Sequence, residues 1–109
     1  MCSDRFEITH EPHDDTERAF KVIARGEIDV DSVGVLGAQF DEVTERGAML
    51  IVLDASDVEF VDSSGLRCII AAAKNLKERG GTFLIEGMSP AVQRVFEVTG
   101  LLEEFRSGE

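Results

Sequence analysis

The sequence predicts an α/β fold in which helices pack against a mixed sheet of four to five strands. Two observations predict it. Segments with the apolar spacing of strands alternate with segments that have the apolar spacing of helices. Glycine, proline and capping residues separate these segments. The order is strand, strand, helix, strand, helix, strand, helix, which corresponds to an opening antiparallel hairpin followed by βαβ units with parallel pairing.

The hairpin is predicted from two alternating segments. Apolar and polar residues alternate over residues 6–10 and again over residues 20–24. The polar stretch 11–18, which contains Pro12, is interpreted as the connection between the two strands.

The first helix is expected over residues 32–46. Its apolar residues are spaced by three or four, Asp31 or Ser32 can cap its start, and Gly47 stands where a helix stops. The continuous apolar run 49–53 that follows is typical of a strand bordered by other strands, and it is expected to end at Asp54.

The second half of the chain adds two helices and a strand. Residues 55–62 are interpreted as a polar turn that leads into a helix, and Gly80 and Gly81 end this helix. A strand is expected over residues 82–86. Ser89 and Pro90 then begin a last helix that ends at Gly100 and leaves a short tail over residues 101–105. The apolar faces of the two helices are Leu66, Ile69, Ile70, Ala73 and Leu76, and Val92, Val95, Phe96 and Thr99.

The charge of the chain is uneven. Its 22 acidic and 11 basic residues give a formal net charge of −11. The part before Ser63 has 16 acidic and 5 basic residues, whereas the rest has 6 of each. Because nucleic acids and anionic lipids bind mainly to Lys and Arg, neither is an expected partner.

The cysteines indicate a reducing compartment. Cys2 and Cys68 are the only two, and their positions predict neither a disulfide nor, with His10 and His13, a metal site. The sequence has no leader pattern and no apolar run long enough to span a membrane, so a cytoplasmic location is expected. No cofactor is expected, because the sequence lacks the glycine-rich loops that bind nucleotides.

The junction before the second helix carries the most chemistry. Asp62, Ser63 or Ser64 can accept hydrogen bonds from the first free N–H groups of the helix, and Gly65 allows the close approach of backbone or partner. On spacing alone, this segment is a helix cap with its turn.

The junction also resembles the signature of a known family, the STAS domains of bacterial anti-sigma-factor antagonists. The Gly-Glu-Ile-Asp segment 26–29 matches a second family element upstream, and the resemblance covers about residues 5–106 of a single domain, 1–109. The residues at matching positions of the junction are Asp54, Ser56, Val58, Phe60, Asp62, Ser63, Ser64, Gly65 and Leu66.

The resemblance implies a regulator rather than an enzyme. In the family, the first serine after the aspartate, here Ser63, is phosphorylated by the partner, an anti-sigma factor that is itself a serine kinase. The unphosphorylated form binds that partner and frees the sigma factor, phosphorylation breaks the complex, and a serine phosphatase restores it. The resemblance also implies that the chain is a monomer and that it acts by partner switching during a stress response. The implied partner-binding residues are Asp29, Asp62, Ser63, Ser64, Gly65 and Arg67.

Arg67 departs from the family pattern, which more often has a small residue at that position. Two other interpretations remain. An enzyme would need a base beside Ser63, and no pattern directs His10 or His13 toward it. A non-phosphorylated STAS module of a sensory complex or of lipid-transport machinery would keep the fold without the switch. Cys68 is expected to be a small core residue, or an oxidation sensor if it is exposed with a lowered pKa.

Overall fold

The computed structural model describes residues 6–13 and 16–100. Its strands run in the spatial order β1-β2-β3-β4, with β1 antiparallel to β2 and the other two pairs parallel. This architecture confirms the predicted α/β fold with a mixed sheet. The elements are β1 (Phe6–His13), β2 (Thr16–Ile28), α1 (Val33–Glu45), β3 (Leu50–Val61), α2 (Ser63–Glu78), β4 (Thr82–Glu86) and α3 (Pro90–Thr99).

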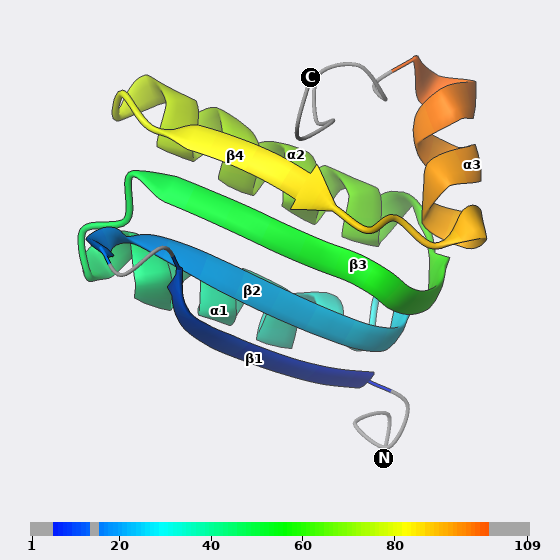
Figure 1. The fold of residues 1–109 in the computed structure, drawn as a ribbon. Coiled ribbons are helices and arrows are strands. Elements are labelled where there is room, and N and C mark those ends of the chain that lie inside the picture. The colour runs from blue at the N-terminus through cyan, green and yellow to red at the C-terminus, as the bar shows by residue number, and fades with distance from the viewer. Residues whose placement is uncertain (1–5, 14–15, 101–109) are drawn as a thin grey trace.

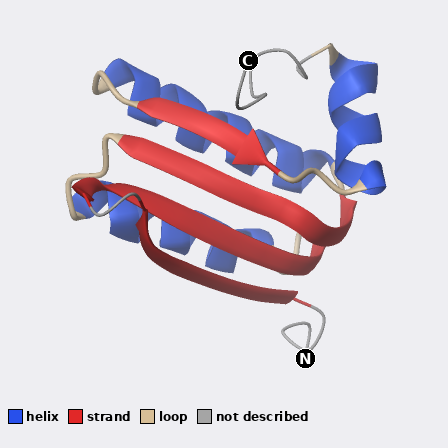
Figure 2. Cartoon of the chain, viewed as in Figure 1, coloured by secondary structure: helices blue, strands red, loops and turns tan. Residues whose placement is uncertain are grey.

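The helices cover the sheet from one side. Figure 1 shows α1 and α2 side by side behind the sheet, whereas α3 stands at the end where β3 and β4 finish. The same two layers are visible in Figure 2. The core lies between them, and α3 contributes Val92 and Phe96, which are 2% and 0% exposed. No helix in residues 6–13 and 16–100 is long and apolar enough to cross a membrane.

The hairpin is longer than the sequence predicts. β1 continues to His13 and β2 begins at Thr16, so most of the stretch 11–18 is paired strand rather than connection. The reason is the place of β1 at the edge of the sheet. Pro12 lacks an N–H group, and an edge strand is one of the few places where a sheet tolerates a proline.

β3 is also longer than predicted, because it runs to Val61 and does not end at Asp54. The β2–β3 pairing contains two register shifts, and the buried residues of this half of the strand are Ala55, Val58 and Val61. Their spacing of three differs from the simple alternation of a regular strand, because each irregularity adds an outward-facing residue. The interpretation of residues 55–62 as a turn is therefore wrong.

Most of the predicted element ends are confirmed. α1 begins after Ser32, β4 spans Thr82–Glu86, and the Ser89 side chain accepts a hydrogen bond from the N–H of Val92 at the start of α3. α3 ends at Gly100, whose φ of +79° is left-handed. Thr99 is exposed and does not belong to the core face of α3. The predicted tail over residues 101–105, like Cys2, lies outside the described residues.

Candidate functional site

The candidate site is built around the start of α2. Asp62 precedes the helix in an extended conformation, with φ −101° and ψ −173°, and its side chain is the cap. Asp62 Oδ1 accepts a hydrogen bond of 2.9 Å from the N–H of Gly65, and its carbonyl accepts one of 2.9 Å from the N–H of Leu66. Of the three capping candidates in the sequence, the structure therefore selects Asp62.

Because the Asp62 side chain already accepts a hydrogen bond from the start of the helix, the hydroxyls of Ser63 and Ser64 are not needed as caps. Ser63 is the first residue of α2 and is exposed, whereas Ser64 is half-buried. Within the described part of the chain, the Ser63 hydroxyl makes no hydrogen bond. It therefore faces solvent and is available to a modifying enzyme.

Gly65 is buried and places the helix start against the sheet. A Cβ atom at this position would press on Ile28 Cγ2 and lie 2.8 Å from Val61 Cγ2 and 3.1 Å from the carbonyl oxygen of Ile28. Van der Waals contacts between carbon atoms are optimal at roughly 3.5–4.0 Å. Only glycine leaves room for this approach, so Gly65 positions its neighbours.

Asp29 organises the turn between β2 and α1. Its Oδ1 accepts hydrogen bonds from the N–H groups of Asp31, at 3.0 Å, and of Ser32, at 3.2 Å, while its own N–H donates to Ser32 Oγ at 2.9 Å. The N–H of Asp62 donates to the carbonyl of Ile28 at 3.1 Å. This bond joins the ends of β2 and β3, so the Asp29 turn lies beside the start of α2.

Arg67 and Cys68 follow on α2. Arg67 is exposed one helical turn after Ser63, and its guanidinium has no hydrogen bond or ion pair among residues 6–13 and 16–100. The Cys68 thiol faces α1, with its sulfur 3.9 Å from the Val33 carbonyl oxygen. Burial raises the pKa of the Cys68 thiol, and the Asp41 carboxylate raises it further. The oxidation-sensor interpretation needs a lowered pKa, and the packing interpretation of Cys68 is the one that fits.

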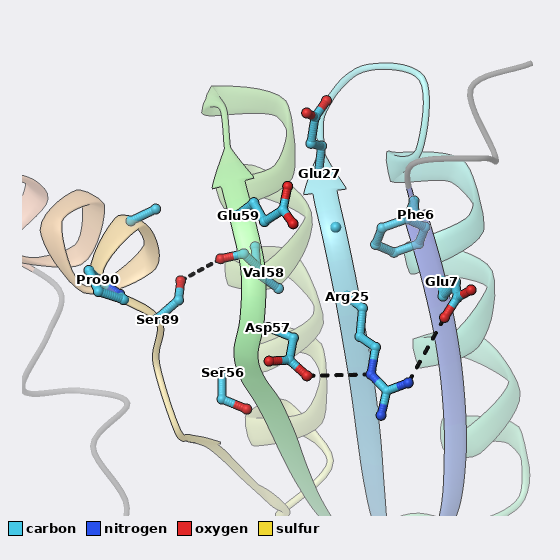
Figure 3. A pocket seen from close by; sticks show the side chains of 12 residues that line it. Phe6, Glu7, Arg25, Glu27, Ser56, Asp57, Val58, Glu59, Ser89 and Pro90 are labelled. Atoms are coloured by element: carbon cyan, nitrogen blue, oxygen red, sulfur yellow. Dashed lines mark hydrogen bonds and ion pairs between the residues drawn. The ribbon is translucent and has the colours of Figure 1, made fainter.

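A groove lies elsewhere, on the face of the sheet opposite α1 and α2. Its volume is about 1010 Å³, and its lining comes from the first three strands and the start of α3. Figure 3 shows Arg25 between two carboxylates, 3.5 Å from Asp57 and 4.0 Å from Glu7. No predicted site residue lines this groove, so the candidate site is an exposed surface. The sequence did not indicate the groove, because part of its wall is the segment of β3 interpreted as a turn.

The two histidines do not form a catalytic arrangement with Ser63. His10 lies on β1, and its Nδ1 is 2.6 Å from Oε1 of Gln39 on α1. Among the described residues, no three His, Cys, Asp or Glu side chains are grouped so that they could hold a metal ion.

The mixed four-stranded sheet thus leads into a helix that is capped by aspartate and has an exposed serine at its first position. The family model described as "Mlab, STAS domain" matches residues 13–105. The chain belongs to the STAS domain family. Among curated relatives, the anti-sigma-B factor antagonist of Bacillus subtilis (strain 168) is 36% identical over 85 residues, which are 78% of this chain and 77% of that protein.

Solved structures of anti-sigma factor antagonists have a similar fold. An anti-sigma factor antagonist from Mycobacterium paratuberculosis has a TM-score of 0.81 at 29% identity, with 94% of this chain and 84% of that chain covered. The Bacillus cell fate determinant SpoIIAA matches in its unphosphorylated form (TM-score 0.75, 21% identity, 89% and 85% covered) and its phosphorylated form (0.69, 20%, 89% and 88%). At that identity SpoIIAA shows the fold alone. The named relatives are anti-sigma factor antagonists, which are regulators rather than enzymes.

Proposed function

We propose that this chain is an anti-sigma-factor antagonist that is switched at Ser63. The unphosphorylated form binds an anti-sigma factor with serine kinase activity, in the cytoplasm, and so releases a sigma factor. The kinase transfers the γ-phosphoryl group of ATP to Ser63 Oγ, which loses its proton, and ADP leaves. The modified chain then dissociates, and a serine phosphatase restores it. We further propose that residues 1–109 act as one domain and as a monomer.

The observation that carries the proposal is the exposed, unbonded hydroxyl of Ser63 beside a cap made by a different residue. Phosphorylation there adds a charge of about −1.5 to −2 at pH 7. The group would meet the carboxylate of Asp62 and the neighbouring Asp29 turn. In a contact with a partner, opposed like charges cost on the order of several kcal/mol, and about 1.4 kcal/mol changes the dissociation constant tenfold. The added charge is therefore large enough to break a tight complex.

The other predicted residues have supporting positions in this proposal. Asp62 and Gly65 fix the start of α2, and Asp29 fixes the adjacent turn. Ser64 and Arg67 lie on the same first turns of α2, where a partner covering Ser63 would meet them.

The test is phosphorylation by a candidate kinase. The purified chain is incubated with ATP and, one at a time, with each serine-kinase anti-sigma factor encoded in the source genome. The expected result, measured by mass spectrometry, is a gain of one phosphoryl group on the native chain and on Ser64→Ala, and no gain on Ser63→Ala. Equal gains on native chain and Ser63→Ala would remove the assignment of Ser63.

A binding measurement completes the test. Ser63→Glu is expected to bind the same kinase at least tenfold more weakly than the native chain, while its circular dichroism spectrum stays native. A chain that no anti-sigma kinase binds or modifies would instead favour the non-phosphorylated STAS module.

A further inference from the structure

Exposed hydrophobic side chains gather near the candidate site. Within residues 6–13 and 16–100, the large hydrophobic side chains that stand exposed are Val30 (69%), Val35 (49%), Phe60 (49%) and Val98 (79%). Val30 directly follows Asp29 in the β2–α1 turn, and Phe60 is two residues before Asp62 at the end of β3. Val98 lies apart, in the last turn of α3.

The packing of the domain does not account for Phe60. In the second half of β3 the buried residues recur every third position, and two residues face outward between each buried pair. Three of these four outward residues are polar, namely Ser56, Asp57 and Glu59, and only Phe60 is apolar. An aromatic ring kept half in water contributes little to the core, although such a side chain has a large apolar surface to bury.

Phe60 and Ser63 lie close together in the chain, where β3 ends and α2 begins. Their positions differ by three, and a strand rises about 3.3 Å per residue, so their Cα atoms lie within about 10 Å of each other. The hydrogen bond from the N–H of Asp62 to the carbonyl of Ile28 places the turn that carries Val30 beside this strand end. Phe60 pairs with Glu27, which lines the groove on the sheet face opposite α2, so a partner that contacts both Ser63 and Phe60 extends over the end of β3.

The surroundings of Phe60 define the chemistry of its partner. Glu27 lies opposite Phe60 in the β2–β3 ladder, Glu59 precedes it, and Asp62 follows two residues later. An apolar side chain with acidic residues next to it in the chain and in the ladder fits a partner with an apolar pocket and a rim of Lys and Arg.

We propose that Phe60, together with Val30, is the apolar anchor by which the unphosphorylated chain binds its anti-sigma factor. The partner supplies an apolar pocket for the ring and basic residues for the carboxylates around it. This inference rests on the proposed function and adds the residue that provides most of the affinity. Ser63 phosphorylation then acts at the start of α2, beside the Asp62 carboxylate, while Phe60 sets how tightly the unmodified chain is held.

The test compares alanine substitutions at exposed hydrophobic positions near to and far from Ser63. The probe is the kinase found to phosphorylate Ser63, and binding is measured by isothermal titration calorimetry without nucleotide hydrolysis. Phe60→Ala is expected to weaken binding about tenfold to hundredfold, as removal of a buried aromatic contact does. Val30→Ala is expected to weaken it several-fold. The matched control, Val98→Ala, is expected to bind as the native chain does.

The outcomes separate this inference from the proposed function. If the kinase phosphorylates Ser63 and binds Phe60→Ala as tightly as the native chain, the anchor is overturned and the switch stands. If no kinase binds or modifies the chain, both are overturned. Urea unfolding of Phe60→Ala and Phe60→Thr gives the remaining check. If both lose cooperative unfolding, Phe60 is a packing residue and the anchor is overturned.

Discussion

Replacing Gly65 with alanine is expected to destabilise the domain, because a new methyl group has no space between α2 and the sheet. The added Cβ would press on Ile28 Cγ2 and lie 2.8 Å from Val61 Cγ2. It would also lie 3.1 Å from backbone, the Ile28 carbonyl oxygen, which cannot rotate away as a side chain can. Relief therefore requires the first turn of α2 to move.

The magnitude follows from two opposing effects. Overpacking of a well-packed site costs about 1–3 kcal/mol. Alanine in place of glycine in a helix returns up to about 1 kcal/mol. The net loss in the free energy of unfolding is therefore between about 0 and 3 kcal/mol, and each kcal/mol lost lowers Tm by roughly 4–5 °C for a domain of this size.

The assay is urea unfolding followed by circular dichroism, with Gly34→Ala as the matched control. Gly34 is also in a helix, but a Cβ there would meet nothing within 4 Å. Gly34→Ala should therefore raise the free energy of unfolding by up to about 1 kcal/mol. If Gly65→Ala gained stability in the same way, the close packing of the α2 start on the end of β2 would be refuted.

Two further substitutions address the cap and the thiol. Asp62→Ala should lower the free energy of unfolding by about 0.5–2 kcal/mol in urea titrations. Asp62→Asn should lower it much less, since asparagine also caps helices. If both variants lost the same free energy, the charge of Asp62, and not its capping hydrogen bond, would be the cause. In a Cys2→Ser background, the raised pKa of Cys68 should make its reaction with Ellman's reagent slower in the folded than in the urea-unfolded chain. The pKa of the thiol is higher in the folded chain than in the unfolded chain. The stability that the thiol contributes is therefore complete at pH values below the pKa in the unfolded chain, about 8.5, and is lost as the pH rises toward the pKa in the folded chain. Cys68→Ala should lack this alkaline loss, and an identical pH profile would contradict the shift.

The helix ends could be predicted from the sequence because their signals are local. Ser89 with Pro90, and Gly47, Gly80 and Gly100 with positive φ, act through the conformation of one or two residues. The order of elements followed from these boundaries. No long-range information was needed for either.

The extent of β3 could not be predicted, because irregular pairing with β2 determines it. The register shifts change which residues face the helices, so alternation in the sequence no longer reports burial. Phe60 is recognised in the sequence as a position of the family signature. The exposure of its ring could not be predicted, because the register shifts obscure which residues of β3 face outward. The sequence identifies the aspartate, serine and glycine of the junction. Only the packing shows that Asp62 caps α2, that Gly65 fits against the sheet and that the Ser63 hydroxyl is left exposed.

These separate roles of Asp62, Ser63 and Gly65 would let the domain carry the proposed charge switch without refolding. The helix start is held by the Asp62 cap on one side and by the fit of Gly65 against Ile28 on the other. Neither interaction uses the Ser63 hydroxyl, so a phosphoryl group there would remove no bond that stabilises the fold. The electrostatic effect of the phosphoryl group would instead fall on the contact between this surface and a partner. A phosphoryl group on Ser63 would add negative charge and bulk beside the Asp62 carboxylate, and a partner that covers the start of α2 would have to desolvate both anions. The apolar contact of Phe60 is unaffected by charge, so the switch is expected to show as a salt-dependent change in association added to a constant apolar contribution.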